Sequence, residues 1–252
     1  MWKYRNRHSW PCLSCSLTMH LFFATNVSGS VCTLGAEESH HCVKVLRLQT
    51  GEHVQVTDGK GNLCKAEIES ANAKACTLRI LESHFEPAPA WQLHVAIAPT
   101  KNIARMEWLI EKLTEIGITS FIPVITQRSE RKILKTERLH KIVMEAMKQS
   151  GRRYLPAVEE LSTYAEMLES TKDFKGQKFV LHCIEKEKRT FQEVYKKGEN
   201  VLILIGPEGD LHNNEVEQAI GHGFTPITLG NVRYRTETAA LVAACALHTL
   251  NY

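Results

Sequence analysis

Two short segments near the carboxyl end of the chain carry the residues best suited to chemistry. The apolar run 201–205 is followed by Gly206-Pro207-Glu208-Gly209-Asp210, and the run 225–229 is followed by GNVRYRTETA at 230–239. A glycine directly after a buried strand lets the backbone approach a ligand closely, because there is no Cβ in the way. The first segment matches neither a Walker loop nor a G-x-G-x-x-G dinucleotide turn. A glutamate between two glycines would also repel a phosphate, so the pattern favours a ligand without phosphate.

Both segments also have a purely structural interpretation. Residues 206–210 could form no more than a tight turn. Arg235 and Glu237 stand two residues apart at a predicted helix start, where they could form an ion pair. Thr236 could cap that helix, and a carboxylate is favoured in its first turn. The residue types alone leave both interpretations open.

The predicted elements place these segments at one edge of a sheet. Five apolar runs of strand length alternate with four helical patterns, the runs at 93–98, 121–125, 179–183, 201–205 and 225–229 and the helices at 103–116, 136–149, 213–221 and 236–250. This alternation predicts an α/β fold, with a mostly parallel sheet and helices on both faces. Ligands of such sheets bind beyond the carboxyl ends of the strands. We therefore expect the loops after Cys183, Ile205 and Leu229 to form a site.

The first third of the chain has a different pattern. From about 20 to 85 the hydrophobic period is mostly two, with three alternating segments at 52–58, 63–69 and 75–81. A turn at 58–61 joins the first two segments, and one helical pattern at 36–48 precedes them. The two prolines in 86–90 then indicate a linker. We predict a small β-rich domain, a barrel, at 19–88, and the α/β domain at 89–252.

Composition limits the possible classes of protein. The 252 residues are 43% hydrophobic and 23% charged, which argues against wholesale disorder and low complexity. No apolar run reaches the roughly 18 residues of a membrane span, so no membrane association is expected. The eight cysteines are scattered, which favours a reducing, cytoplasmic location. Residues 1–18 lack a signal-peptide core and are expected to be a disordered extension. Their Cys12 and Cys15 have no second close Cys/His pair, so no metal site is expected.

Charge is concentrated locally. The net charge of +3 comes from Lys3, Arg5 and Arg7, because the rest of the chain has 28 basic and 28 acidic residues. Between residues 128 and 153, however, nine basic residues face only three glutamates. A run of this kind is often a solvated helix face, and the alternative is a surface that contacts nucleic acid.

Taken together, the motifs resemble those of the RsmE family, 16S ribosomal RNA uridine-N3 methyltransferases of the SPOUT superfamily. The resemblance rests on GPEGD followed by LGNVRYRTETAA, and it extends over nearly everything after Met19. Further matching motifs, in order, are His40-His41, Val45-Leu46-Arg47, Gly51, Asp58-Gly59, Lys101, Arg105, Glu111-Lys112, Thr114-Glu115-Ile116-Gly117, Pro123, Arg128-Ser129, Glu145-Ala146, Gln149-Ser150, Arg152 and Leu155-Pro156.

The resemblance implies a fold, a cofactor and partners. It implies a PUA-like N-terminal domain, a SPOUT domain with a deep trefoil knot, a homodimer, and 16S rRNA or the small ribosomal subunit as substrate. It also implies S-adenosylmethionine as methyl donor, without a metal. The residues implied for the cofactor are Leu181, His182, Gly206, Pro207, Glu208, Gly209, Leu229, Gly230, Tyr234, Thr238 and Ala239. Those implied for RNA are Arg47, Lys101, Arg105, Arg128, Arg131, Arg152 and Arg153.

Arg235 and Glu237 are the candidate catalytic residues. The N3 of uracil is a poor nucleophile until its proton leaves, and a cation near O2 or O4 would stabilise the resulting anion. Arg235 would supply that cation, while Glu237 would accept the proton or hold Arg235. The chain departs from the common family pattern at Asp210, Asn231-Val232 and Tyr234, and its basic residue near the cofactor loop is Arg233. The alternatives are a SPOUT methyltransferase for another RNA site or base atom, and an RNA-binding protein without catalysis.

Overall fold

The computed structural model describes residues 19–27, 29–185 and 187–251, so the predictions for 1–18, including Cys12 and Cys15, lie outside it. The described residues form two compact units. One holds the residues up to Asp58 together with 62–84, and the other holds 59–61 together with the residues from Phe85 onward. Within the described residues, no helix is long and apolar enough to cross a membrane.

The first unit is a curled five-stranded sheet. Its strand order is β1-β3-β4-β5-β2, with β1 parallel to β3. The bounds are Leu21–Phe23 for β1, Val31–Thr33 for β2, His53–Thr57 for β3, Asn62–Ser70 for β4 and Thr77–Phe85 for β5. The sheet is a half-barrel rather than a closed one, because its described path begins at β1 and ends at β2. Its core includes Phe22, Val56 and Ile68, all at most 1% exposed.

The helical pattern predicted at 36–48 is shorter in the structure. It consists of α1 (Ala36–His40), which continues as the π-helix η1 (His41–Val45). Arg47 follows with a φ of 57°, in the left-handed region that few residues other than glycine adopt. This conformation ends the helix before the predicted boundary.

The second unit is built on a parallel sheet of order β12-β10-β11-β6-β7-β8, with β9 also paired to β7. The bounds are Leu93–Ile97 for β6, Ser120–Ile125 for β7, Ala157–Val158 for β8, Ser162–Thr163 for β9, Gln177–Leu181 for β10, Val201–Ile205 for β11 and Phe224–Ile227 for β12. β10 and β12 end two residues before the predicted Cys183 and Leu229. The loops that follow them are longer for that reason.

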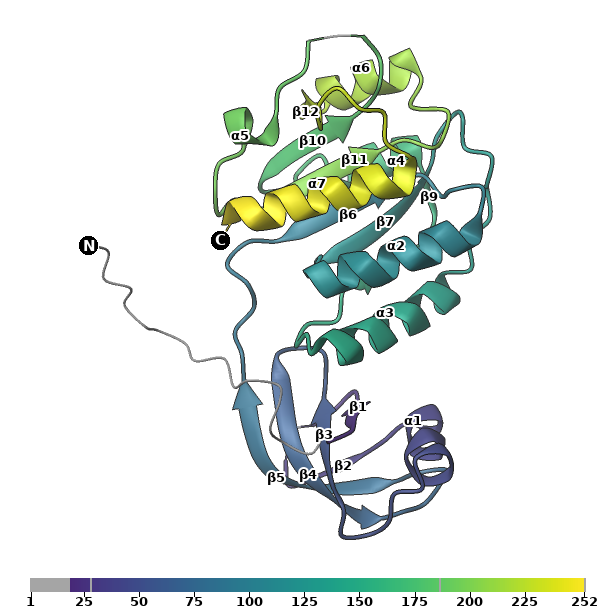
Figure 1. Cartoon of the computed structure of the whole chain (residues 1–252), viewed down its shortest axis with the longest axis vertical. Helices are drawn as coiled ribbons and strands as arrows, with labels where there is room; N and C mark the ends of the chain where they lie inside the picture. The colour runs from purple at the N-terminus through teal and green to yellow at the C-terminus, as the bar shows by residue number, and fades with distance from the viewer. Residues whose placement is uncertain (1–18, 28, 186, 252) are drawn as a thin grey trace, which may run out of the picture. The chain divides into compact units, whose positions relative to one another are not determined.

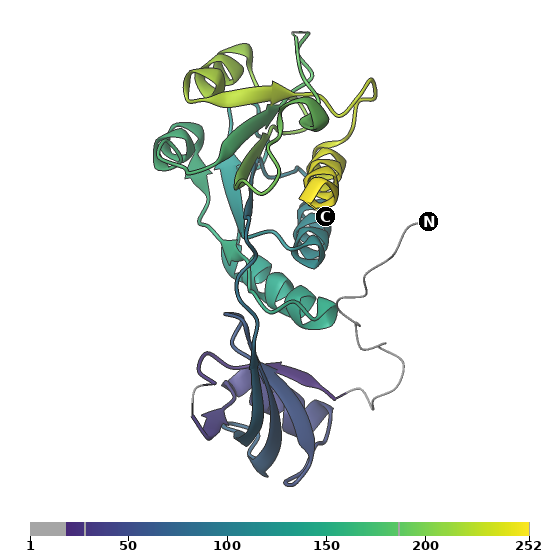
Figure 2. The same ribbon diagram turned by 90° about the vertical axis from the view of Figure 1, so that its left-hand side faces the viewer.

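Helices cover both faces of this sheet (Figures 1 and 2). The first face carries α2 (Ile103–Ile116), α3 (Thr136–Ser150), α5 (Phe191–Val194) and α7 (Thr236–Asn251), and the second carries α4 (Tyr164–Ser170) and α6 (Asn213–Gly221). β11 shows why both faces must be covered. Ile203 packs among the first set of helices and Leu204 among the second, and all five residues of the strand are buried.

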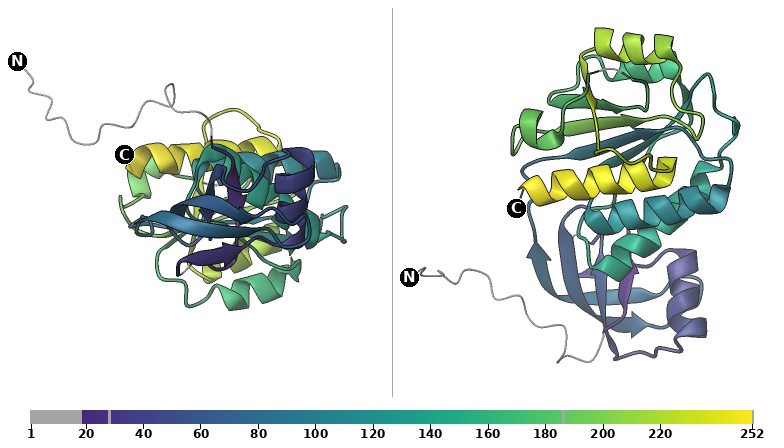
Figure 3. Two further views of the ribbon diagram at one scale, coloured as in Figure 1. Left: turned by 90° about the horizontal axis from the view of Figure 1, so that it is seen from below. Right: turned by 45° about the horizontal axis from the view of Figure 1, so that its top comes forward.

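α2 runs beside α7, and its ends are well defined (Figure 3). The Asn102 side chain accepts the backbone N–H of Ala104, and Gly117 ends the helix with a φ of 101°. A Cβ on Gly117 would lie 2.6 Å from the Arg152 guanidinium, which covers this end and donates to the carbonyls of Glu115 and Ile116. Arg152 therefore satisfies carbonyls that the last turn leaves without a helical partner.

Candidate functional site

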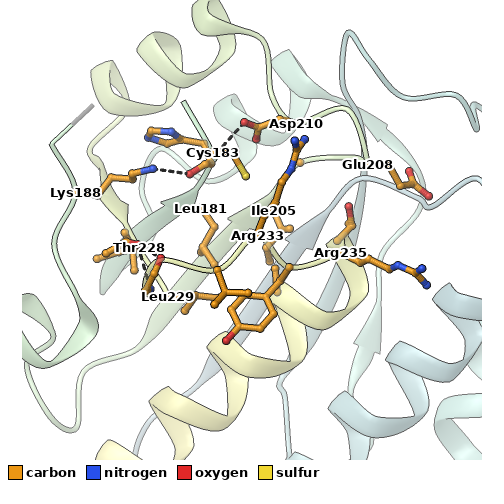
Figure 4. Close-up of a pocket in the computed structure, with 18 of the residues that line it drawn as sticks. Leu181, Cys183, Lys188, Ile205, Glu208, Asp210, Thr228, Leu229, Arg233 and Arg235 are labelled. Atoms are coloured by element: carbon orange, nitrogen blue, oxygen red, sulfur yellow. Dashed lines mark hydrogen bonds between the residues drawn. The ribbon is translucent and has the colours of Figure 1, made fainter. Parts of the chain in front are cut away.

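A cavity of about 790 Å³ opens at the carboxyl edge of the parallel sheet (Figure 4). It is lined by the loops after β10, β11 and β12, which are neighbours in the sheet although they are distant in sequence. Nine of the eleven residues predicted for the cofactor line it, namely Leu181, His182, Gly206, Pro207, Glu208, Leu229, Gly230, Tyr234 and Ala239. Gly209 and Thr238 lie outside the lining, and Arg235 lies within it.

The lining also contains residues that the sequence analysis did not assign to the cofactor. They include Cys183, Lys188, Ile205, Asp210, Thr228 and Arg233. All of them lie in the loops after β10, β11 and β12 or at their boundaries, so the loop boundaries were the signal that could have found them. The apolar members, such as Leu181, Ile205 and Leu229, form walls suited to a flat aromatic group, while backbone and polar side chains occupy the rest.

The loop after β11 has a fixed conformation. Asp210 has a φ of 65°, and its Oδ1 accepts the N–H of Leu211 at 2.9 Å. Its Oδ2 accepts the N–H of Cys183 at 2.8 Å, which ties this loop to the one after β10. A Cβ on Gly206 would lie 2.8 Å from the Leu211 backbone nitrogen, so glycine is required where the loop folds back. Asp210 thus has a clear structural role in this loop.

Glu208 connects the same loop to the one after β6. Its Oε1 accepts the backbone N–H of Lys101 at 2.9 Å. On the outer side, the Arg128 guanidinium donates to the carbonyl of Gly209 at 2.8 Å. The loop is therefore held from three neighbouring segments, and the glutamate that disfavours a phosphate ligand also serves as a structural acceptor.

Arg235 and Glu237 occupy different environments. The Arg235 carbonyl accepts the first helical N–H of α7, from Ala239 at 2.8 Å, and the Arg235 side chain is exposed at the cavity. Figure 4 shows it extending toward the side where Glu208 lies, away from Leu181 and Cys183. Glu237 is only 6% exposed, is not part of the lining, and has its Oε1 3.6 Å from the Nε of Arg105 on α2. The ion pair found for Glu237 in the described residues is therefore with Arg105, not with the sequence neighbour Arg235.

Most residues predicted to bind RNA hold parts of the protein together. Arg131 donates to the carbonyls of Thr100 and Lys101, at 3.1 and 2.7 Å. Lys101 forms an ion pair with Glu130 at 2.8 Å, and the Nε of Arg153 lies 3.8 Å from Glu86. Arg128 and Arg152 donate to backbone carbonyls as described above. The predicted basic surface is thus partly structural, and exposed Lys132 and Lys135 remain its more accessible members.

Comparisons with known protein families and proteins identify the chain. Residues 86–248 match the RNA methyltransferase domain, and residues 34–81 match the RNA methyltransferase PUA domain. The chain is 33% identical over 226 residues to the ribosomal RNA small subunit methyltransferase E of Synechocystis sp., which covers 86% of this chain and 73% of that protein. The chain belongs to the RsmE family. The Bacillus subtilis protein of the same name is 31% identical, over 85% of this chain and 88% of its own length.

Solved structures agree with this membership of the RsmE family. A probable rRNA methyltransferase from Porphyromonas gingivalis is 36% identical with a TM-score of 0.82, over 92% of this chain and 98% of that one. The ribosomal RNA small subunit methyltransferase E of Neisseria gonorrhoeae, solved with bound S-adenosylmethionine, is 28% identical with the same TM-score and coverage. The α/β fold with a PUA domain, predicted from sequence, is confirmed. The trefoil knot and the homodimer stay predictions.

Proposed function

We propose that this chain transfers a methyl group from S-adenosylmethionine to N3 of a uridine in 16S ribosomal RNA. The observation that carries the proposal is the cavity at the carboxyl edge of the sheet. Residues of the GPEGD loop and of the segment with Arg235 both line this cavity. The chain that carries it belongs to the RsmE family. RNA methylation is the family's chemistry, and the cavity provides a place for the donor beside a cation.

The residues of the cavity fit S-adenosylmethionine. The cofactor has an adenine ring, a ribose and an amino acid, but no phosphate, in agreement with Glu208 in the wall. Leu181, Ile205 and Leu229 would cover the adenine. The backbone around Gly206 and Gly230 would form hydrogen bonds with the polar groups of the ribose and the amino acid. When bound, the cofactor supplies a methyl group on a positively charged sulfur, ready for attack by a nucleophile. The predicted roles of Gly209 and Thr238 would then be indirect, since neither lines the cavity.

Arg235 is the residue we assign to the uracil. Its backbone sits at the start of α7, so its side chain reaches the cavity from a rigid base. A guanidinium beside O2 or O4 stabilises the anion that forms when N3 loses its proton. Since N3 lies on the pairing edge, the target base must be unpaired or extruded. Positioning of this base against the donor accounts for much of the rate.

The remaining parts of the proposal concern domains and partners. The PUA-like domain, proposed at 19–88, would hold RNA through Arg47 and neighbouring residues, and the catalytic domain would span 89–252. Phosphate contacts of this kind position the RNA without reading its sequence. We also propose a homodimer in the cytoplasm, as the resemblance to the family implies. The second candidate is a SPOUT methyltransferase for another RNA site or base atom.

Nucleoside mass spectrometry tests the proposed function. Ribosomal RNA from a strain lacking the gene should lack 3-methyluridine in its 16S fraction. Incubation of its small subunits with the purified chain and S-adenosylmethionine should restore that nucleoside. A different methylated nucleoside would instead support the second candidate. Calorimetry with the donor alone provides the control, because a protein that only binds RNA would show no uptake of it.

A further inference from the structure

Glu237 is a buried carboxylate that the methyl-transfer chemistry does not use. It is the second residue of α7, is 6% exposed, and does not line the cavity. Its Oε2 is buried without a hydrogen-bond partner in the described residues. A carboxylate behind the cavity wall is badly placed to take a proton from a base bound in front of it. Burial of a charge also costs free energy unless that charge has a purpose or a partner.

The partner of Glu237 is Arg105, in the first turn of α2. The Arg105 Nε lies 3.6 Å from Glu237 Oε1, and the two helices run side by side (Figure 3). An arginine at this end of a helix is disfavoured by the helix dipole, and no acidic residue of the same turn compensates it. Helix stability therefore does not explain the placement of Arg105. The carboxylate from α7 offsets this cost and lies 3.6 Å from one side of the guanidinium.

Arg105 lies at the carboxyl edge of the sheet, the same edge at which the cavity opens. It follows the loop after β6, whose Lys101 N–H is bound by Glu208 of the cavity wall. The Arg105 side chain is 37% exposed, whereas the side chain of Glu237, taken alone, is 8% exposed. Part of the guanidinium therefore faces solvent. Arg105 does not line the cavity itself, whereas Arg235, two residues before Glu237, does. The structure thus places one arginine, Arg235, in the cavity lining and the other, Arg105, outside that lining against the buried carboxylate.

We infer that Glu237 is a positioning residue, and that the Arg105 guanidinium which it holds binds a phosphate next to the target uridine. This inference rests on the proposed function. A planar guanidinium with one edge held by a carboxylate presents its other donors in a fixed direction, which suits the bidentate binding of a phosphate. Arg235 then contacts the base, and Arg105 fixes the backbone of the same nucleotide. In this arrangement Glu208 disfavours a phosphate in the cavity itself, and the phosphate of the target nucleotide binds outside it, at Arg105.

The test compares Arg105→Ala, Glu237→Gln and the double variant in the full-length chain. RNA binding and steady-state methylation are measured with small ribosomal subunits. Each single variant should raise KM for the subunit roughly tenfold, the scale of one lost charge-assisted contact. kcat and the Kd for S-adenosylmethionine should change much less. The slope of log K against log salt should fall by about one.

The double variant should be no worse than either single variant, because both remove the same contact. Arg105→Lys should restore part of the affinity.

Glu107→Gln is the matched control, because Glu107, on α2, is another carboxylate that pairs with an arginine of a different helix, Arg138 on α3. It should lower the melting temperature without changing KM or the salt slope. The inference would be overturned if Glu237→Gln reduced kcat and shifted the acidic limb of the pH–rate profile while the salt slope stayed normal. It would also be overturned if the variants changed only the melting temperature. If the wild type transfers no methyl group, the proposed function fails, while the salt slope of RNA binding still tests the phosphate contact.

Discussion

At the scale of the residue, Asp210 shows how one side chain can shape a ligand pocket without touching the reaction. Its carboxylate joins the loops after β11 and β10 through the N–H groups of Leu211 and Cys183. The required backbone conformation, with a φ of 65°, is one that aspartate tolerates better than most residues. Two loops that the sheet brings together thereby become one rigid wall.

Arg235 gives the clearest prediction at this scale. Arg235→Ala should slow methyl transfer by about 10²–10³-fold, the range for one lost charge-stabilising donor. Arg235→Lys should rescue the rate only in part, because a point charge cannot reproduce a planar fork of donors. The defect should shrink as pH rises, since the uracil proton then leaves more easily. Single-turnover rates at several pH values measure this effect.

Melting curves distinguish this catalytic role from a structural one. Arg235 has an exposed side chain, and the carboxylate two residues on pairs with Arg105 instead. Its replacement should therefore leave the melting temperature and the affinity for S-adenosylmethionine nearly unchanged. An Arg235→Ala enzyme that works at full speed and is merely less stable would contradict the catalytic assignment.

At the scale of the element, the loops at the carboxyl edge are joined by arginines that donate to backbone carbonyls. Arg128 holds the loop after β11, and Arg131 holds the loop after β6. The same chemistry recurs at the C-terminal end of α2, where Arg152 takes the last carbonyls. Hydrogen bonds to charged donors contribute more than neutral ones, so Arg128 and Arg131 support the shape of the site directly, while Arg152 stabilises the end of α2.

The arrangement predicts that the basic segment divides into two functional groups. Arg128→Ala should lower the melting temperature and weaken S-adenosylmethionine binding, because the GPEGD loop loses its outer support. Lys132→Ala combined with Lys135→Ala should leave both properties unchanged but weaken RNA binding and flatten its salt dependence, by a slope of about two. Filter binding across a salt series, beside calorimetry and melting curves, measures the difference. An unchanged salt slope in the lysine variant would mean that this segment is only a solvated face.

At the scale of the whole molecule, each unit has its own core. The first is built on Phe22, Val56 and Ile68, and the second on helices packed against both faces of the parallel sheet. Residues 1–18 contribute three positive charges and no hydrophobic pattern.

A chain that starts at Met19 should therefore fold and methylate like the 252-residue chain. Its melting temperature should differ by no more than the small effect expected of surface changes. Its mass by sedimentation should also be that of the full-length assembly, which we expect to be a dimer. Large losses of stability, activity or association on truncation would show that residues 1–18 have a structural role.

The sequence by itself determined the class of fold, the order of most elements and the loops that form the cavity. The helices at 103–116 and 213–221 have the predicted bounds, because their hydrophobic period is strong and Asn102 and Gly117 mark the ends of the first. β1, β2, α4, α5, β8 and β9 were missed, since elements of two to seven residues carry too few periodic positions to stand out. Resemblance supplied the family that the comparisons confirm, and nine of the residues it predicts for the cofactor line the cavity.

Only the tertiary structure decided which charged side chains meet. Arg105 and Glu237 come from helices that are far apart in sequence and become neighbours because both pack on one face of the sheet. The tertiary structure likewise shows that Arg128, Arg131 and Arg152 donate to backbone carbonyls, a structural role that their positions in the sequence do not indicate. Their predicted contacts with RNA stay predictions. Local sequence encodes periodicity and turns, but contacts between side chains depend on sheet order and helix packing. Sheet order and helix packing therefore pair Glu237 with Arg105 and place Arg235 at the cavity.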